Sequence, residues 1–351
     1  MSFTYLCQKH ADEHKNKILT VPVTTKISDE YLLGLDNASF IKSFSTLQDI
    51  AASIYDDMIN SPEGYGLKMI PVTEGSVNLV SCFGNILYAF GILGTLSEKK
   101  LIIDVDLYKK MVQKHNSNKV QLKLQDFGFV IDGFNGKTFD RGLMDFSVSY
   151  PDDPDVIITL KALSFAAQPF IENATTDKYY IDDVFNLFSF RPLEDRATQI
   201  HETMFLMMTD HYSDKIKVTL YAFHKKMKML GFKYPGLYGS ISYEKNGIRN
   251  ISFGYGATKD IISARIIFKD IEQLKSVIQP SNMKINSPFR QSTCKFCAKR
   301  ETPDKPCPKR VTHEFDGKTY HNCKMLSFVF NDIQLADIDD LIKLIKIEYR
   351  V

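Results

Sequence analysis

Tryptophan is absent from the 351-residue chain, and so is any strong excess of one charge. The 44 basic and 42 acidic residues leave a net charge of +2, which by itself indicates neither an acidic nor a basic partner. The first 17 residues, MSFTYLCQKHADEHKNK, lack the apolar core and small-residue cleavage site of a secretory signal. These absences favour a cytoplasmic location and leave local patches as the only indication of a nucleic-acid partner.

A convincing membrane span is also missing. The segment from Ser76 to Ser97 is uncharged for 22 residues, which is long enough to cross a bilayer. It contains two asparagines, three glycines and three serines, a composition more typical of a buried core helix. We therefore expect no membrane partner.

The sequence motifs of several common enzyme classes do not occur. There is no phosphate-binding loop, no dinucleotide-binding glycine pattern, no nucleophile elbow and no HExxH metal motif. Paired carboxylates from distant segments leave no local trace, so the question of an enzyme stays open and no catalytic residue is assigned.

The residues that are present describe an α+β protein. The composition, 44% hydrophobic and 25% charged, is that of a globular chain, and its length favours two domains. Hydrophobic periodicity predicts helices packed on small antiparallel sheets. The predicted divisions are an irregular N-terminal segment at 1–42, a helix-rich domain at 43–170, an acidic linker at 171–196 and an α+β domain at 197–351.

The helix-rich domain is predicted to contain a winged-helix-like unit. From 77 to 150 the patterns give helix, short strand, helix, turn, helix, strand, turn and strand, which is the order of a winged helix-turn-helix. In such modules the second helix of the pair enters the major groove, and here that helix is 119–127. The predicted nucleic-acid contacts are basic residues of this helix and of the wing: Lys119, Lys123, Lys137 and Arg141.

Other readings of the same unit remain open. Val120, Leu122 and Leu124 alternate, which also fits a strand, and the lysines also fit a solvated surface. A winged-helix order also serves protein interaction. The expected partner is thus a nucleic acid or another protein.

Two segments 103 residues apart resemble each other weakly. KLQDFGFVIDGFNG (123–136) and KMKMLGFKYPGLYG (226–239) share a lysine, a Gly-Phe pair and two later glycines. Both predict a helix closed by glycine and followed by a strand. Duplication of a unit and independent use of a common helix stop both explain the likeness.

Four of the six cysteines fall within thirty residues near the C-terminal end. Their spacing begins with C-x2-C, a pattern that sets two thiolates on one tight turn as tetrahedral zinc requires. Four thiolates complete the tetrahedron and leave no position for water, so the predicted zinc is structural. The predicted ligands are Cys294, Cys297, Cys307 and Cys323.

Several alternatives to this zinc site stay open. His321 or His313 can replace one thiolate, and a set of only three cysteines would leave a position for water. An iron–sulfur cluster also takes four cysteines, although this spacing fits neither ferredoxin pattern. Redox chemistry at the C-x2-C pair, or four cysteines without metal, are the remaining readings.

These observations favour a non-enzymatic binding or regulatory protein with a structural zinc site and a nucleic acid or protein partner. The alternative is an enzyme or small-ligand-binding protein whose pocket lies in the second domain. That pocket would be lined by tyrosines, although cross-strand packing explains such residues equally well. The tyrosines are Tyr234, Tyr238, Tyr243 and Tyr255.

Overall fold

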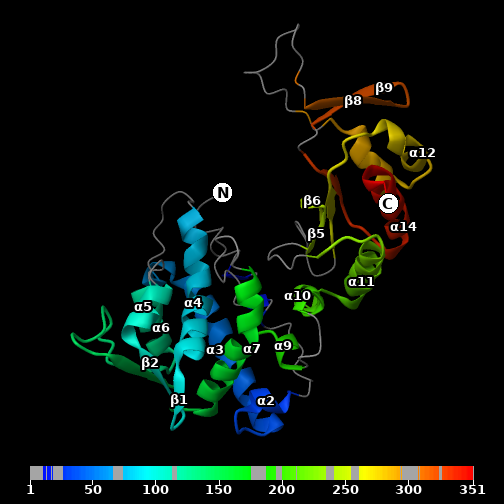
Figure 1. Cartoon of the computed structure of the whole chain (residues 1–351). Helices are drawn as coiled ribbons and strands as arrows, with labels where there is room; N and C mark the ends of the chain where they lie inside the picture. Colours follow the sequence, from blue (N-terminus) through cyan, green and yellow to red (C-terminus); the bar gives the residue numbers. More distant parts are fainter. Residues whose placement is uncertain are drawn as a thin grey trace. The chain divides into compact units, whose positions relative to one another are not determined.

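The structure of the chain is a computed structural model (Figure 1) that divides into two compact units, residues 1–207 and 208–351. The first unit is described over residues 11–12, 14–16, 18, 27–65, 74–112, 117–174, 187–194 and 200–207. The second is described over 208–210, 212–234, 241–253, 261–292, 294, 307, 309–323 and 326–350.

Unit 1 is built around a long apolar helix, α4, which packs against α7 on one side and the α5–α6 pair on the other (Figure 1). A third long helix, α3, packs on α7 and is capped by Asp36, whose side chain accepts the Ser39 N–H at 2.8 Å. The helices of unit 1 are α2 (Asp29–Leu32), α3 (Asn37–Asn60), η1 (Pro62–Tyr65), α4 (Glu74–Leu93), α5 (Val105–Val112), α6 (Ser117–Asp126), α7 (Asp155–Ala174) and α9 (Arg191–Glu194), with α10 (Ile200–Thr209) at the division between the units.

Gly91 sets the close crossing of α4 and α7. A Cβ atom at this position would lie 2.0 Å from Ser164 Oγ and 2.7 Å from the backbone oxygen of Leu160. Only a residue without a side chain allows the two helices to approach this closely. The uncharged segment predicted as a core helix is confirmed as one up to Leu93, with Phe83 to Phe90 buried, whereas Thr95–Ser97 forms a short strand.

An antiparallel sheet with strand order β1-β2-β4-β3 completes unit 1. Its inner face, which includes Leu101, Ile103, Phe146 and Val148, is buried against the helices. Alternation of buried and exposed residues along β2 and β4 shows that the other face is solvated. The strands are β1 (Thr95–Ser97), β2 (Lys100–Asp104), β3 (Val130–Asp132) and β4 (Asp145–Ser149).

The predicted linker at 171–196 is not uniform. Residues 175–186 and 195–196 lie outside the described residues. Leu187, Phe188, Phe190 and Leu193 are buried in the core of unit 1, where Phe190 lies 3.9 Å from Phe44 between ring centroids. The described part of the segment thus belongs to unit 1, because its apolar residues complete that core.

Unit 2 contains a second antiparallel sheet, of order β10-β7-β6-β5, and a separate β8–β9 hairpin. An aromatic cluster packs at one face of the sheet and consists of Phe268, Phe289, Phe328 and Phe330. Its elements are α11 (Asp214–Met229), β5 (Ile241–Lys245), β6 (Ile248–Phe253), β7 (Ala264–Ile266), η3 (Glu272–Leu274), α12 (Lys275–Ile278), α13 (Met283–Asn286), η4 (Ser287–Arg290), β8 (Arg310–Phe315), β9 (Lys318–Cys323), β10 (Phe328–Phe330), η5 (Leu335–Asp337) and α14 (Ile338–Tyr349).

Two hairpins of unit 2 follow from their turn residues. Asn246 and Gly247 have φ values of 53° and 74°, and Asp316 and Gly317 have 51° and 71°. Two successive residues with positive φ form the turn that matches the twist of antiparallel strands. The α+β class with small antiparallel sheets is thus confirmed. Among the described residues, no helix has both the length and the apolar character needed to cross a bilayer.

Candidate metal centre and basic face

Cys307 and Cys323 meet at the open end of the β8–β9 hairpin. Cys323 is the last residue of β9 and pairs directly with Arg310, the first residue of β8. The Arg310 N–H donates to the carbonyl oxygen of Cys307 at 3.0 Å, so a turn carries Cys307 to the same end. Directly opposed strand residues lie about 5 Å apart between Cα atoms, which brings the two cysteines within one turn of each other.

Cys294 reaches the same end of the hairpin from the other side. Its N–H donates to the carbonyl oxygen of His321 at 3.0 Å, and the His321 N–H donates to Ser292 Oγ at 3.1 Å. Ser292 and Cys294 therefore lie beside β9 at His321, two residues from Cys323. Three cysteines from separate segments converge on one hairpin end, and each is half-buried.

The fourth predicted ligand, Cys297, lies outside the described residues. Over the part of the chain that is described, no group of three or more histidine, cysteine or carboxylate side chains is placed to hold a metal ion, and Cys294, Cys307 and Cys323 form no disulfide. The backbone contacts thus bring three of the four segments together, while their sulfur atoms are not arranged around a common point.

The two histidines of the hairpin have different roles. His313 is buried, its Nε2–H donates to the carbonyl oxygen of Phe289 at 2.8 Å, and its Nδ1 accepts from Asn322 Nδ2 at 3.4 Å. Burial lowers the pKa of His313, which keeps the ring neutral as these two bonds require. With both nitrogens engaged, His313 joins the hairpin to η4 and is poorly placed as a metal ligand.

His321 stands on the other face of the hairpin, the face that it shares with Cys323 two residues later. Its Nδ1 lies 3.0 Å from Oγ1 of Thr312, its partner across the strands. A metal-binding histidine commonly has its other ring nitrogen held by such a hydrogen bond. Of the two histidines considered from the sequence, His321 is therefore the one whose position suits a ligand.

The basic face predicted in unit 1 is divided by the structure. Lys119, Lys137 and Arg141 are exposed, and the Asn118 side chain on α6 donates to the backbone oxygen of Lys137, joining the helix to the β3–β4 loop. Lys123 instead points inward, to Asp57 on α3. The exposed part of the predicted face consists of one helix residue and two loop residues.

Lys123 belongs to a polar cluster between α6 and α3. Its Nζ lies 2.9 Å from Asp57 Oδ2 and 5.5 Å from the ring centroid of Tyr65, and the Tyr65 hydroxyl donates to the same carboxylate at 2.8 Å. The hydrogen bond that Lys123 donates to Asp57 raises the pKa of Lys123. Lys123 and Asp57 together carry no net charge, so this lysine attracts a phosphate only weakly.

The predicted tyrosine-lined pocket does not correspond to an open site at its described members. Tyr234 and Tyr243 are buried and pack around His224, whose Nδ1 lies 3.0 Å from the Tyr243 hydroxyl. Tyr238 and Tyr255 lie outside the described residues. Phe223 adds an edge contact to Tyr243, so the described tyrosines form core packing.

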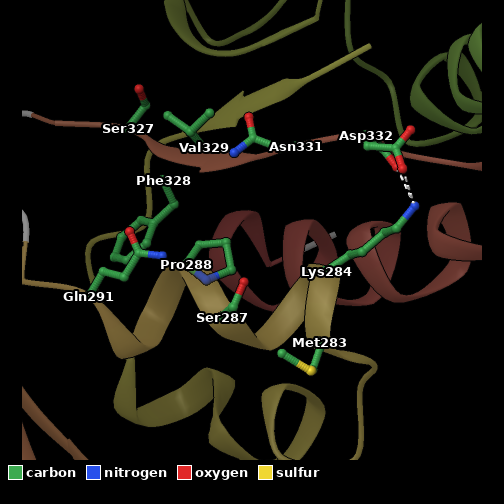
Figure 2. Close-up of a pocket in the computed structure, with 10 residues that line it drawn as sticks. All are labelled: Met283, Lys284, Ser287, Pro288, Gln291, Ser327, Phe328, Val329, Asn331 and Asp332. Atoms are coloured by element: carbon green, nitrogen blue, oxygen red, sulfur yellow. Dashed lines mark hydrogen bonds and ion pairs between the residues drawn. The ribbon is translucent and has the colours of Figure 1, made fainter. Parts of the chain in front are cut away.

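A groove that the sequence patterns did not indicate lies elsewhere in unit 2 (Figure 2). It has a volume of about 440 Å³ and runs between the α13–η4 segment and the strand β10. Its walls come from two segments that lie 36 to 49 residues apart in the sequence, and no local motif marks them.

The chain was compared with models of protein families, with curated proteins and with solved structures, and none of them matches it.

Proposed function

We propose that the chain is a non-enzymatic binding protein whose second unit is stabilised by a structural zinc ion at the open end of the β8–β9 hairpin. The observation that carries this proposal is the convergence of Cys294, Cys307 and Cys323 on one hairpin end through backbone contacts. Cys297, three residues after Cys294, supplies the fourth thiolate. Four thiolates fill the tetrahedral positions, so the ion takes no substrate.

The chemistry of this donor set fits zinc in a supporting role. An isolated two-stranded hairpin is at best marginally stable in water. The described contacts that join this one to the remainder of unit 2 are mostly polar, such as those of His313 with Phe289 and of Asp316 with Arg290. Zinc bound by thiolates from three segments contributes folding free energy that such a hairpin needs. Small rearrangements of side chains bring the sulfur atoms together without changing the strand register.

Metal analysis of the full chain tests this proposal. We expect one zinc per chain in the natural protein and in a Cys7→Ser control, because Cys7 stands far from the cluster in sequence. A Cys323→Ser variant is expected to lose most of the zinc. Iron in place of zinc, no metal at all, or full zinc retention in Cys323→Ser contradicts the proposal.

We further propose that unit 1 contacts a nucleic acid through α6 and the β3–β4 loop. The order β2, α5, α6, β3, β4 and the pairing of β4 between β2 and β3 support a winged-helix-like arrangement. Lys119 on α6 and Lys137 in the loop are both exposed and are joined through Asn118. In this arrangement the three exposed basic residues contact phosphates, and the duplex is positioned by charge rather than by base recognition.

Binding of a fluorescent DNA duplex at several salt concentrations tests this second proposal. Each of Lys119→Gln and Lys137→Gln is expected to lower the slope of log affinity against log salt by about 1. Lys123→Gln is the matched control, because Asp57 already neutralises this lysine, and its slope should not change. Absence of binding at low salt, or an equal effect of all three substitutions, contradicts the proposal.

A further inference from the structure

The two edge strands of the sheet in unit 2 differ in whether a neighbouring segment covers them. On the β5 edge, Lys233 and Glu244 exchange two backbone hydrogen bonds of 2.8 Å, so a neighbouring segment covers that strand. The opposite edge is β10, which pairs only with β7 among the described strands. Uncovered edge strands present backbone donors and acceptors that readily accept another strand.

The hydrogen-bond pattern shows which groups of β10 face outward. The carbonyl oxygen of Ile262 accepts from Ile333, so Ile262 directs its backbone groups toward the β10 side. In an extended strand every second residue points the same way, which adds Ala264 and Ile266. Their partners are Phe330 and Phe328. Val329, between these two, must direct its N–H and C=O away from β7.

Those two groups open into the groove described above. Its lining includes Ser327, Phe328, Val329, Asn331 and Asp332, a nearly unbroken run of the chain. Because alternate residues of a strand point to opposite faces, a groove lined by consecutive residues runs along the edge. Figure 2 agrees, since Val329 and Asn331 point to one side of β10 and Phe328 to the other.

The opposite wall of the groove is the α13–η4 segment. Pro288 faces the Phe328 side, and Lys284 and Ser287 lie along the same wall (Figure 2). Met283 is 79% exposed at the rim, where a flexible thioether can adapt to different apolar groups. The groove therefore combines an apolar strip, hydrogen-bonding side chains and the open edge of a strand.

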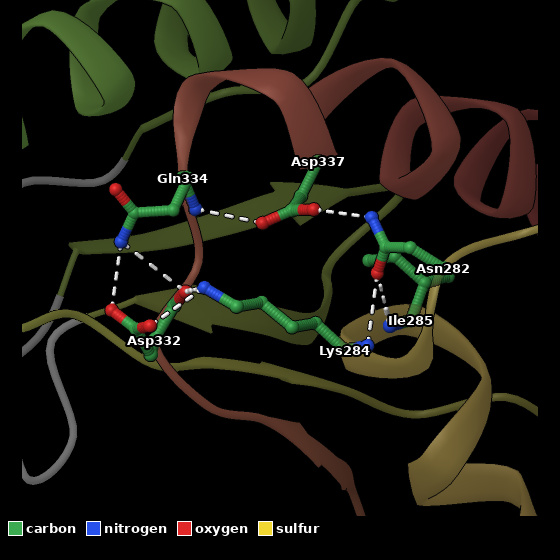
Figure 3. Close-up of polar contacts among 6 residues, drawn as sticks. All are labelled: Asn282, Lys284, Ile285, Asp332, Gln334 and Asp337. Atoms are coloured by element: carbon green, nitrogen blue, oxygen red, sulfur yellow. Dashed lines mark hydrogen bonds and ion pairs between the residues drawn. The ribbon is translucent and has the colours of Figure 1, made fainter.

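A network of polar contacts fixes the two walls relative to each other (Figure 3). Lys284 Nζ lies 2.6 Å from Asp332 Oδ2, and Gln334 Nε2 donates to the other oxygen of that carboxylate at 2.7 Å. Asp337 accepts from Asn282 Nδ2 at 2.6 Å, and Asn282 in turn caps α13. These contacts fix the positions of the two walls of the groove.

We propose that an extended peptide segment of a partner protein binds in this groove and adds a further strand to β10. An extended chain is the ligand that presents a C=O and an N–H at the spacing of the Val329 pair. The peptide places an apolar side chain against Pro288 and Phe328. It has little net charge, because Lys284 and Asp332 already neutralise each other at the end of the groove.

Backbone amide hydrogen exchange of the full chain tests the geometry without any ligand. The amides of Phe328 and Phe330 are expected to exchange slowly, because each donates to β7, and the amide of Val329 to exchange at least tenfold faster. A slow Val329 amide in dilute protein overturns the proposal, since that N–H would already have a partner. Protection of Val329 that grows with protein concentration shows pairing with a second copy and also overturns it.

Binding is tested with a peptide selected from a random twelve-residue displayed library against the full chain. Val329→Pro removes the outward N–H and is tolerable at an edge position, whereas Val329→Thr keeps it and is the matched control. We expect affinity for the selected peptide to fall at least tenfold in Val329→Pro and to change less than twofold in Val329→Thr. Ser287→Arg fills the groove from the opposite wall and should weaken binding in the same way.

The outcomes separate cleanly. Failure to select any peptide, or selected peptides whose affinity is insensitive to both Val329→Pro and Ser287→Arg, overturns the proposal. If Val329→Pro does not fold, Ser287→Arg and the protection of the Val329 amide on peptide addition decide the question. None of these measurements reads out zinc content or binding of nucleic acid, so failure of this proposal is distinguishable from failure of the proposed function.

Discussion

The C-terminal ends of α6 in unit 1 and α11 in unit 2 have the same pattern of capping hydrogen bonds, although their surroundings differ. In α6, Phe129 N–H donates to Leu124 O at 3.1 Å and Gly128 N–H to Gln125 O at 3.1 Å. In α11, Phe232 N–H donates to Met227 O at 3.0 Å and Gly231 N–H to Lys228 O at 2.9 Å. Both are glycine-terminated Schellman caps, with φ of 92° and 76° at the glycine.

The two segments differ immediately after the cap. Phe129 leads into β3, whose three residues pair with β4, whereas Phe232 leads to a single bridge between Lys233 and Glu244. Each phenylalanine packs on a tyrosine, Phe129 on Tyr150 and Phe232 on Tyr349. The helix stop is thus a property of the local sequence, while the length of the following strand depends on what lies beside it.

Removing the proposed zinc should have the largest effect on stability, and it should lower the stability of unit 2 but not of unit 1. We expect a strong chelator, or Cys323→Ser, to lower the unfolding free energy of unit 2 by about 3 kcal/mol or more, because metal binding contributes directly to folding. Unit 1 should unfold as before. The measurement is urea unfolding followed by hydrogen exchange of amides in each unit, and equal loss in both units would contradict the expectation.

Alanine at the two capping glycines tests the comparison itself. Each substitution places a side chain at positive φ, which costs about 1 kcal/mol. At Gly128 the new Cβ would also lie 3.0 Å from the Tyr150 ring, whereas at Gly231 the nearest atom is Lys245 Nζ at 3.9 Å. We therefore expect Gly128→Ala to cost about 2 kcal/mol and Gly231→Ala about 1 kcal/mol, measured by thermal unfolding. Equal costs would show that Tyr150 moves aside.

Acidification should affect unit 2 before unit 1 because of His313. Burial, the largest cause, lowers the pKa of this histidine, while Glu272 and Lys275 act on it with opposite signs. Below about pH 6.5 the unfolded chain binds a proton that the folded unit does not, so stability falls as pH drops toward the lowered pKa, by about 1.4 kcal/mol per pH unit. His313→Gln should flatten this slope relative to the natural chain in urea titrations between pH 7 and 5. An unchanged slope in the His313→Gln variant would contradict the assignment of this pH dependence to His313.

Asp57 should give unit 1 a sensitivity to acid at lower pH, with a smaller effect. Burial raises the pKa of this carboxyl, but hydrogen bonds from Lys123 and Tyr65 outweigh that and hold the pKa below its usual range. The contribution, about 1 kcal/mol, is present above roughly pH 4 and is lost as pH falls through the lowered pKa. Asp57→Asn should remove this pH dependence from the stability of unit 1 and leave the stability of unit 2 unchanged. The measurement is the unfolding free energy of each unit at pH 5 and at pH 3.

Much of the secondary structure was predictable, because local chemistry decides it. The helix predicted at 119–127 is α6, and the predicted order of elements between 77 and 150 is the order of α4, β2, α5, α6, β3 and β4. The core helix α4 was also predictable from its uncharged sequence.

Candidate sites were less predictable, because a side chain's direction depends on its neighbours. Lys123 lies on the predicted helix, yet Asp57, sixty-six residues earlier, draws it inward. Tyr243 was a candidate pocket residue, and only its packing on β5 against Phe223 and His224 shows that it is core. The groove beside β10 had no sequence signal, since its two walls are unrelated segments.

The sequence by itself determined where helices stop, where hairpins turn and which cysteines are grouped, because these depend on residues within a few positions of one another. Only the tertiary structure decided that β10 pairs with β7, some sixty residues earlier, that the β5 edge is covered and that Val329 faces an open groove. The reason is physical: burial of apolar surface chooses among many possible strand pairings, and that choice is made by the whole unit rather than by any short segment.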